Sequence, residues 1–199
     1  MGEYDPLLPI GPADEEDDLA WVQELFAAAA RPYLSFPWSW LAWALLLPFG
    51  ALATEPALAA GGPSRLLMLW SGLVLAGGAV ELVGIRRGRR RHGGSGLGGW
   101  ALGVQGNLSL VGLLLSTLLV VVGEAWALPG LWLLLLGHSF YILGGLAFAP
   151  MRPYGILYQV AGMVALWPWG GRPFAVFAIA TCLGNLWMAW AVWRAGRPE

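Results

Sequence analysis

Two ionisable side chains, Glu81 and His138, lie inside long apolar stretches of the chain. A carboxylate or an imidazole in a membrane interior is a candidate for binding a proton or a cation, or for ligating a metal or haem. Each residue also has a structural interpretation. Glu81 can reach toward the arginines that follow it, and His138 can hydrogen-bond to a neighbouring helix. The sequence leaves both interpretations open.

Four amide side chains in the apolar stretches extend this candidate set: Gln105, Asn107, Gln159 and Asn185. Together with Glu81 and His138 they form a candidate polar path through a membrane. The alternative is that they hydrogen-bond between helices. No nucleophile–base pair or group of metal ligands is visible, and His92 is the only other histidine. We therefore predict no catalytic residue, no metal site and no cofactor.

Two residue counts exclude further chemistry. The chain contains no lysine, so Schiff-base chemistry that needs a lysine amine is excluded. Cys182 is the single cysteine, which excludes an intrachain disulfide and a CxxC redox or zinc motif.

The composition predicts that lipid surrounds most of the chain. Of the 199 residues, 58% are hydrophobic and 12% are charged, whereas soluble domains carry about 25% charged residues. A single core of this length cannot hide so much apolar surface from water. We predict an all-α, multi-pass membrane protein, because the apolar runs are continuous and lack the alternation of a β-barrel strand.

Six stretches approach the roughly 20 apolar residues that cross a bilayer as a helix. They are residues 36–54, 66–85, 100–122, 128–148, 154–169 and 173–193. The fifth is the shortest. We expect a bundle of about six transmembrane helices, residues 36–194, preceded by a short amphipathic helix.

The arginines predict the orientation, because cytoplasmic loops are enriched in basic residues. Placing the segment RRGRRR inside puts nine arginines inside: Arg31, Arg86, Arg87, Arg89, Arg90, Arg91, Arg152, Arg194 and Arg197. Only Arg65 and Arg172 then lie outside. We expect a bacterial inner-membrane location with both termini in the cytoplasm.

Several tryptophans match the predicted span ends, where the indole ring prefers the headgroup level. Those near the outer ends are Trp70, Trp126, Trp132, Trp167 and Trp169. Those near the inner ends are Trp38, Trp40, Trp100, Trp190 and Trp193.

Regions outside the spans differ in composition. Residues 1–16 are expected to be an acidic disordered arm. Residues 17–35 are expected to lie at the interface as an amphipathic helix over 17–31, because Leu19, Val22, Leu25 and Phe26 recur at helical spacing. Residues 195–199 are expected to be a cytoplasmic tail.

The basic segment after the second apolar stretch is a candidate site for anionic lipid headgroups, through Arg86, Arg87, Arg89, Arg90 and Arg91. The alternative is that it only sets the topology. Because topology explains this cluster, we expect no nucleic-acid partner. The expected partners are the lipid bilayer and either a membrane or cytoplasmic protein or a second copy of the chain.

Internal similarity is weak when the second and fourth stretches are compared. LLMLWSGLVLAGG and LWLLLLGHSFYILGG share a Leu/Trp-rich start and a later Gly-Gly pair, but the spacing to the glycines differs by two residues. This comparison does not indicate a duplication.

Four segments carry a resemblance to known proteins: VQELFAAAARPYLSFPWSW, AVELVGIRRGRRR, LPGLWLLL from Leu128 to Leu135, and Tyr154-Gly155. Over residues 20–195 the chain resembles a family of uncharacterised bacterial membrane proteins with six transmembrane helices and unknown function. Ser39 is followed by Trp40 where that family has Ser-Gly. The resemblance implies a fold and a topology, and no activity, cofactor or catalytic residue. A weaker resemblance, in Leu/Gly texture, is to small six-span acid-stress membrane proteins.

Three functions remain open from the sequence. The first is a non-enzymatic structural or regulatory subunit of the membrane, which the scarcity of titratable groups favours. The second is a small-solute or proton-coupled transporter or channel that uses the candidate polar path. The third is a membrane redox or enzyme subunit centred on His138.

Overall fold

The computed structural model describes residues 20–29, 36–93, 96–167 and 171–195, and all regular structure in these residues is helical. Residues 20–29 form a helix at one end of the molecule, inside the range 17–31 predicted to be amphipathic. The expected acidic arm, residues 1–16, lies outside the described residues.

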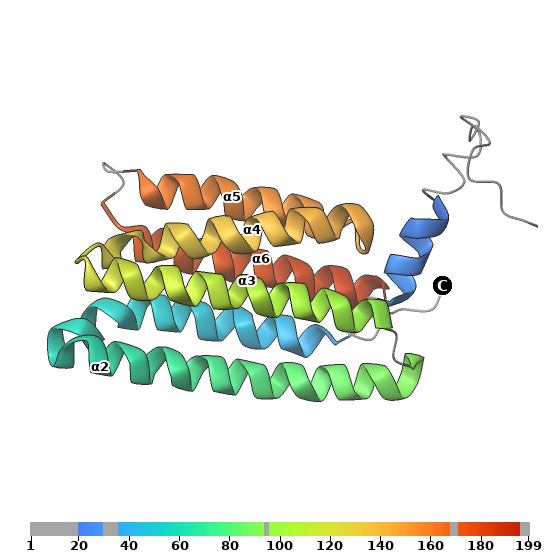
Figure 1. The fold of residues 1–199 in the computed structure, drawn as a ribbon, viewed down its shortest axis with the longest axis horizontal. Coiled ribbons are helices and arrows are strands. Elements are labelled where there is room, and N and C mark those ends of the chain that lie inside the picture. The colour runs from blue at the N-terminus through green and yellow to red at the C-terminus, as the bar shows by residue number, and fades with distance from the viewer. Residues whose placement is uncertain (1–19, 30–35, 94–95, 168–170, 196–199) are drawn as a thin grey trace, which may run out of the picture.

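The bundle that follows is built from parallel and antiparallel helices (Figure 1). Its elements are α2 (Pro37–His92), α3 (Gly96–Val121), the short 3₁₀ helix η1 (Ala125–Ala127), α4 (Leu128–Leu146), α5 (Met151–Leu166) and α6 (Pro173–Ala195).

Helix α2 is a hairpin of two helical arms that reverses at two glycines. The backbone leaves helical geometry at Gly61 (φ −169°, ψ 17°) and Gly62 (φ 64°, ψ −155°). The conformation of Gly62 belongs to a region that is essentially restricted to glycine. Pro63 then begins the second arm, where its fixed φ suits the first helical position. The arms 37–60 and 63–92 lie side by side in Figure 1.

Four helical segments are long and apolar enough to cross a membrane: Pro37–His92, Leu102–Val121, Ala125–Leu146 and Pro173–Ala195. The first includes both arms of α2. Helix α5 has 16 residues, fewer than the roughly 20 that a perpendicular crossing needs.

The second arm of α2 extends further than the sequence predicted. The span was expected to end at residue 85 and to be followed by a basic loop, but the helix continues through all five arginines to His92. Arginine is a good helix former, and its long side chain reaches water from a helix that leaves the hydrocarbon region. The RRGRRR segment is therefore a helical extension.

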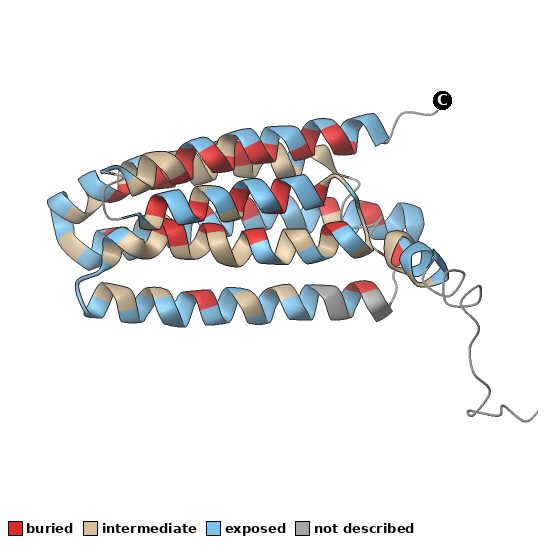
Figure 2. Cartoon of the chain, turned by 90° about the horizontal axis from the view of Figure 1, so that it is seen from above, coloured by how far each residue is buried: buried red, intermediate tan, exposed pale blue. Residues whose placement is uncertain are grey.

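The core is formed mainly by α4, α5 and α6 together with the first arm of α2. The largest fully buried side chains include Leu133, Tyr154, Tyr158 and Met188. Buried residues follow α6 over most of its length (Figure 2). Glycines bring α4 and α5 close, because a Cβ added to Gly144 or Gly155 would overlap backbone atoms of the facing helix.

Basic residues in the described part of the chain separate by end of the bundle. Arg152, Arg194 and the five arginines of the α2 extension lie at one end. Arg65 and Arg172 lie at the other end, next to the α2 reversal and the α5–α6 connection. Seven of the nine arginines expected on one side therefore lie at one end, and the other two, Arg31 and Arg197, lie outside the described residues.

The α2 reversal generates a prediction about stability. Gly62→Ala should lower the free energy of unfolding by about 1–3 kcal/mol, because alanine is strained at this backbone conformation. The space around Gly62 is open, so no steric contact contributes.

Gly72→Ala is the matched control, since Gly72 is helical and also open to its surroundings. It should be neutral or stabilising by roughly 0.5–1 kcal/mol. Detergent-mediated unfolding followed by circular dichroism measures both variants. Equal effects at the two sites would contradict a turn that depends on Gly62.

Candidate functional site

Three buried side chains form what we call the tyrosine–asparagine cluster, at the interface of α5 and α6. The hydroxyl oxygens of Tyr154 and Tyr158 are 2.7 Å apart. The Tyr154 hydroxyl lies 3.2 Å from Oδ1 of Asn185, and Nδ2 of Asn185 donates to the Tyr158 hydroxyl at 3.1 Å. Tyr154, Tyr158 and Asn185 are each at most 2% exposed.

These contacts close a ring in which each hydroxyl donates once and accepts once. The second hydrogen of the Asn185 amide goes to the carbonyl of Thr181 at 2.7 Å. The Thr181 hydroxyl donates to the carbonyl of Phe177 at 2.8 Å. No buried side-chain nitrogen or oxygen in the described residues lacks a partner. The cluster therefore satisfies its own donors and leaves none for a solute.

Aromatic rings enclose this cluster on the side of α4 and α2. The ring of Phe140 lies 4.7 Å from Tyr154 and 5.9 Å from Tyr158, between ring centroids. Trp40 contacts Tyr154 edge-on at 5.9 Å. The aromatic rings of Phe140 and Trp40 exclude water from the cluster. This strengthens the buried hydrogen bonds and makes a polar group without a hydrogen-bond partner costly.

Two tryptophans make the same hydrogen bond in two different hairpins. Nε1 of Trp70 donates to the hydroxyl of Thr54 at 3.0 Å. Nε1 of Trp132 donates to the hydroxyl of Ser116 at 2.9 Å. Both hydroxyls donate in turn to a glycine carbonyl four residues earlier, Gly50 and Gly112, at 2.7 Å. The sequence placed both indoles near the outer ends of their spans, and in the structure each N–H donates to a hydroxyl of the neighbouring helix.

These equivalent contacts reveal a repeat with a spacing of 62 residues. Gly112, Ser116, Gly123 and Trp132 follow Gly50, Thr54, Gly61 and Trp70 at that spacing without gaps. The glycines of the pair Gly61 and Gly123 both lie where the chain leaves a helix. The α2 hairpin and the α3–α4 hairpin are therefore built on one pattern.

Aligning the Gly-Gly pairs of the second and fourth apolar stretches does not give this repeat, because the aligned glycines have different surroundings. Gly77 packs against the ring of Trp43, whereas Gly144 packs against the backbone of Arg152. The signal that finds the repeat is the pattern of a glycine, a hydroxyl four residues later and a tryptophan sixteen residues after that.

Glu81 and Gln105 each pair with one residue of a neighbouring rod. Oε2 of Glu81 accepts from Nε1 of Trp43 at 3.4 Å, across the two arms of α2. Oε1 of Gln105 accepts from the hydroxyl of Ser139 at 2.6 Å, between α3 and α4. Trp43 and Gln105 are again 62 residues apart. Within the described residues Glu81 has no ion pair with the arginines that follow it.

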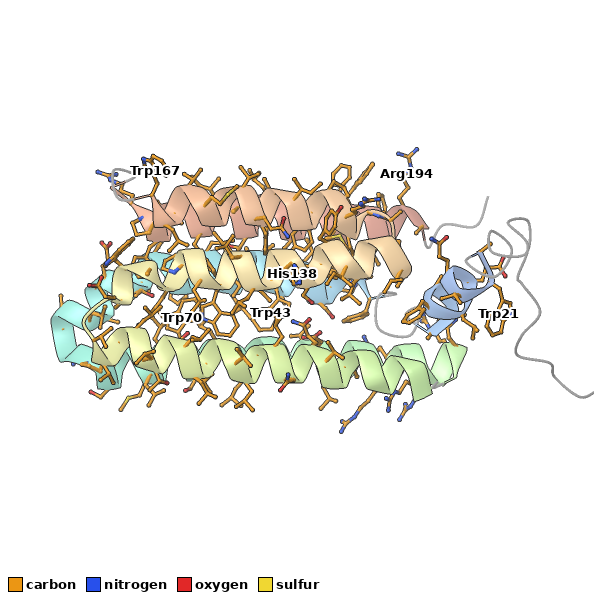
Figure 3. All side chains as sticks on the ribbon, turned by 45° about the horizontal axis from the view of Figure 1, so that its top comes forward. Trp21, Trp43, Trp70, His138, Trp167 and Arg194 are labelled. Atoms are coloured by element: carbon orange, nitrogen blue, oxygen red, sulfur yellow. The ribbon has the colours of Figure 1, made fainter. Side chains whose placement is uncertain are left out.

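The remaining candidates of the polar path lie elsewhere. His138, midway along α4, is exposed and makes no hydrogen bond to another described residue (Figure 3). Asn107 is exposed on α3, and Gln159 is half-buried against Gly137 of α4. The six candidates therefore occupy several separate surfaces and do not converge among the described residues.

The arginines of the α2 extension lie on a helix surface and are mostly exposed to solvent. Arg87 lies over the ring of Phe36, with its guanidinium carbon 5.6 Å from the ring centroid. No three His, Cys, Asp or Glu side chains among the described residues gather as metal ligands would.

Comparisons with known proteins give no further guide. No protein-family model matches the chain, and neither curated proteins nor solved structures give a significant match. The functional argument therefore depends on the geometry described above.

The tyrosine–asparagine cluster predicts how the stability of the bundle changes when the Asn185 amide is lost. Asn185→Leu should lower the free energy of unfolding by about 1–2 kcal/mol, because it leaves the two tyrosine hydroxyls without their amide partner. Asn107→Leu, at the exposed amide of α3, should change it little. Unfolding in detergent measures both. A larger effect at Asn107 would contradict a structural role for the tyrosine–asparagine cluster.

The repeated tryptophan contacts predict equal energetic coupling at two places. A double-mutant cycle with Trp70→Phe and Thr54→Val, and a second with Trp132→Phe and Ser116→Ala, should each give a coupling of about 0.6 kcal/mol, the average for hydrogen bonds between membrane helices. Coupling in one hairpin and none in the other would show that the two contacts are not equivalent.

Proposed function

We propose that this chain is a non-enzymatic structural or regulatory subunit of a bacterial inner membrane. In this proposal both arms of α2 and helices α3 to α6 provide six membrane crossings, with both termini in the cytoplasm. The separation of arginines between the two ends of the bundle supports this orientation.

The observation that carries the proposal is the way polar side chains are used. Those in the apolar helices that lie between rods pair mainly with one another: Asn185 with two tyrosines, Gln105 with Ser139, and two indoles with hydroxyls. Such contacts fix helix packing in lipid. A transport path needs polar groups that face a shared route and exchange partners with a solute.

Surface exposure supports a role as a subunit. In the membrane window of α3 only 6% of residues are buried inside the chain, against 56% for α6. Helix α3 exposes many large apolar side chains, including Val104, Leu110, Leu114 and Leu118. Gly103 and Gly106 add open positions with nothing near them. A helix so little covered by its own chain has room for a partner helix.

The two alternative functions lack comparable support. A transporter that uses Glu81, His138 and the four amides needs them along one route, and they occupy separate surfaces. A redox subunit centred on His138 needs further groups aimed at that imidazole, and the described residues bring none to it.

Purified full-length chain in mild detergent tests the proposal, with a second copy as the expected partner. Light scattering should give a mass above that of one 21.3 kDa chain. Gly103→Leu should reduce it to one copy, because bulk on this face separates closely packed helices. Gly72→Leu, at an open glycine of α2, should leave the assembly intact. A strictly monomeric wild-type chain would contradict the subunit role.

A further inference from the structure

A shallow groove lies between the last turns of α6 and the turn that joins α4 to α5. It has a volume of about 290 Å³ and is lined by Phe148 and Pro150 of the turn and by Trp187, Trp190 and Arg194 of α6, with two alanines of α6 between them. The five α6 residues occupy positions i, i+3, i+4, i+7 and i+8, which share one helix face. The groove is at the end of the bundle opposite Trp167 (Figure 3).

The walls of the groove are aromatic and are held together by specific contacts. The rings of Trp187 and Trp190 lie 5.2 Å apart. Nε1 of Trp187 donates to the carbonyl of Pro150 at 3.4 Å, which ties the turn to α6. Both indoles are nearly half exposed, so their rings present an apolar surface to whatever occupies the groove.

Arg194 places a positive charge at the end of this apolar surface nearest the C-terminus of α6. The guanidinium of Arg194 lies over the ring of Trp190, 5.3 Å from its centroid. Within the described residues Arg194 has no ion pair with a carboxylate. An arginine held by a ring keeps its planar N–H groups in the geometry that pairs with phosphate oxygens.

We propose that this groove binds one anionic phospholipid, with an acyl chain against Trp187, Trp190 and Phe148 and the phosphate on Arg194. Along α6 the arginine follows Trp190 by four residues, a rise of about 6 Å. That separation places the indoles at the acyl–headgroup boundary when the guanidinium is at the phosphate level. Charge and apolar wall thus match the two parts of one lipid molecule.

The groove differs from the arginines of the α2 extension, of which Arg87 lies over the single ring of Phe36, because at Arg194 two indoles and Phe148 line a groove beside the charge. A cluster of that kind attracts any anionic surface. A soluble anion would need only the charge of Arg194 and would gain nothing from the aromatic wall. The occupant that uses both features is a lipid.

Native mass spectrometry of the delipidated full-length chain tests the proposal, with added phosphatidylglycerol or phosphatidylcholine. Wild type should retain one phosphatidylglycerol at least fivefold more than phosphatidylcholine. Arg194→Gln should reduce the two lipids to equal retention. Trp190→Leu should weaken retention of both lipids. Because Trp190 is nearly half exposed, this variant should still fold, and circular dichroism verifies that it does.

Arg90→Gln, an exposed arginine of the α2 extension at the same end, is the matched control and should keep the preference. Three outcomes would overturn the proposal: equal retention by wild type, an unchanged preference in folded Arg194→Gln, or displacement of the lipid by inorganic phosphate at millimolar concentration. The measurement is independent of assembly, because a monomer retains the groove.

Discussion

A polar group inside this bundle has no water to bind, and the packing depends on how each one is satisfied by the chain itself. The hydroxyls of Thr54, Ser116 and Thr181 donate to carbonyls one helical turn earlier. In the first two, the hydroxyl oxygen then accepts an indole N–H from the neighbouring rod. One residue thus satisfies its own hydrogen and anchors a second helix, which restricts the rotation of the two helices against each other.

Large rings on glycines set the distance over which those hydrogen bonds act. The ring of Trp43 covers Gly77, the ring of Trp132 covers Gly112, and the ring of Tyr154 covers Gly184. A ring on a glycine lets the rods approach while filling the space that a small residue leaves. In the Trp132 contact the ring lies on Gly112 and its N–H reaches Ser116 one turn later. Packing and polar satisfaction are therefore provided by the same side chain.

Hydropathy predicted the helical class and most helix bounds, because the length of an apolar run is a property of the sequence alone. The rotation of each helix was not predictable in the same way. Lipid and protein interior are both apolar, so the side of a helix that faces outward has no distinguishing polar residues. Asn185 and Asn107 therefore looked alike in sequence, although the first is enclosed and the second is exposed. The extension of α2 through Arg91 was missed because charge was taken as the mark of a loop.

Residues that set topology and residues that bind a ligand need not be different residues. By its sequence context alone, Arg194 was one charge among those expected inside. The structure stacks it on Trp190 beside an apolar groove, whereas Arg87 of the α2 extension lies over the ring of Phe36 and does not line that groove. The reverse holds for Asn185, whose amide marked it as a site and whose donors are all used within the chain. In a membrane protein with so few charges, the surroundings of a polar group therefore indicate its role better than its residue type does.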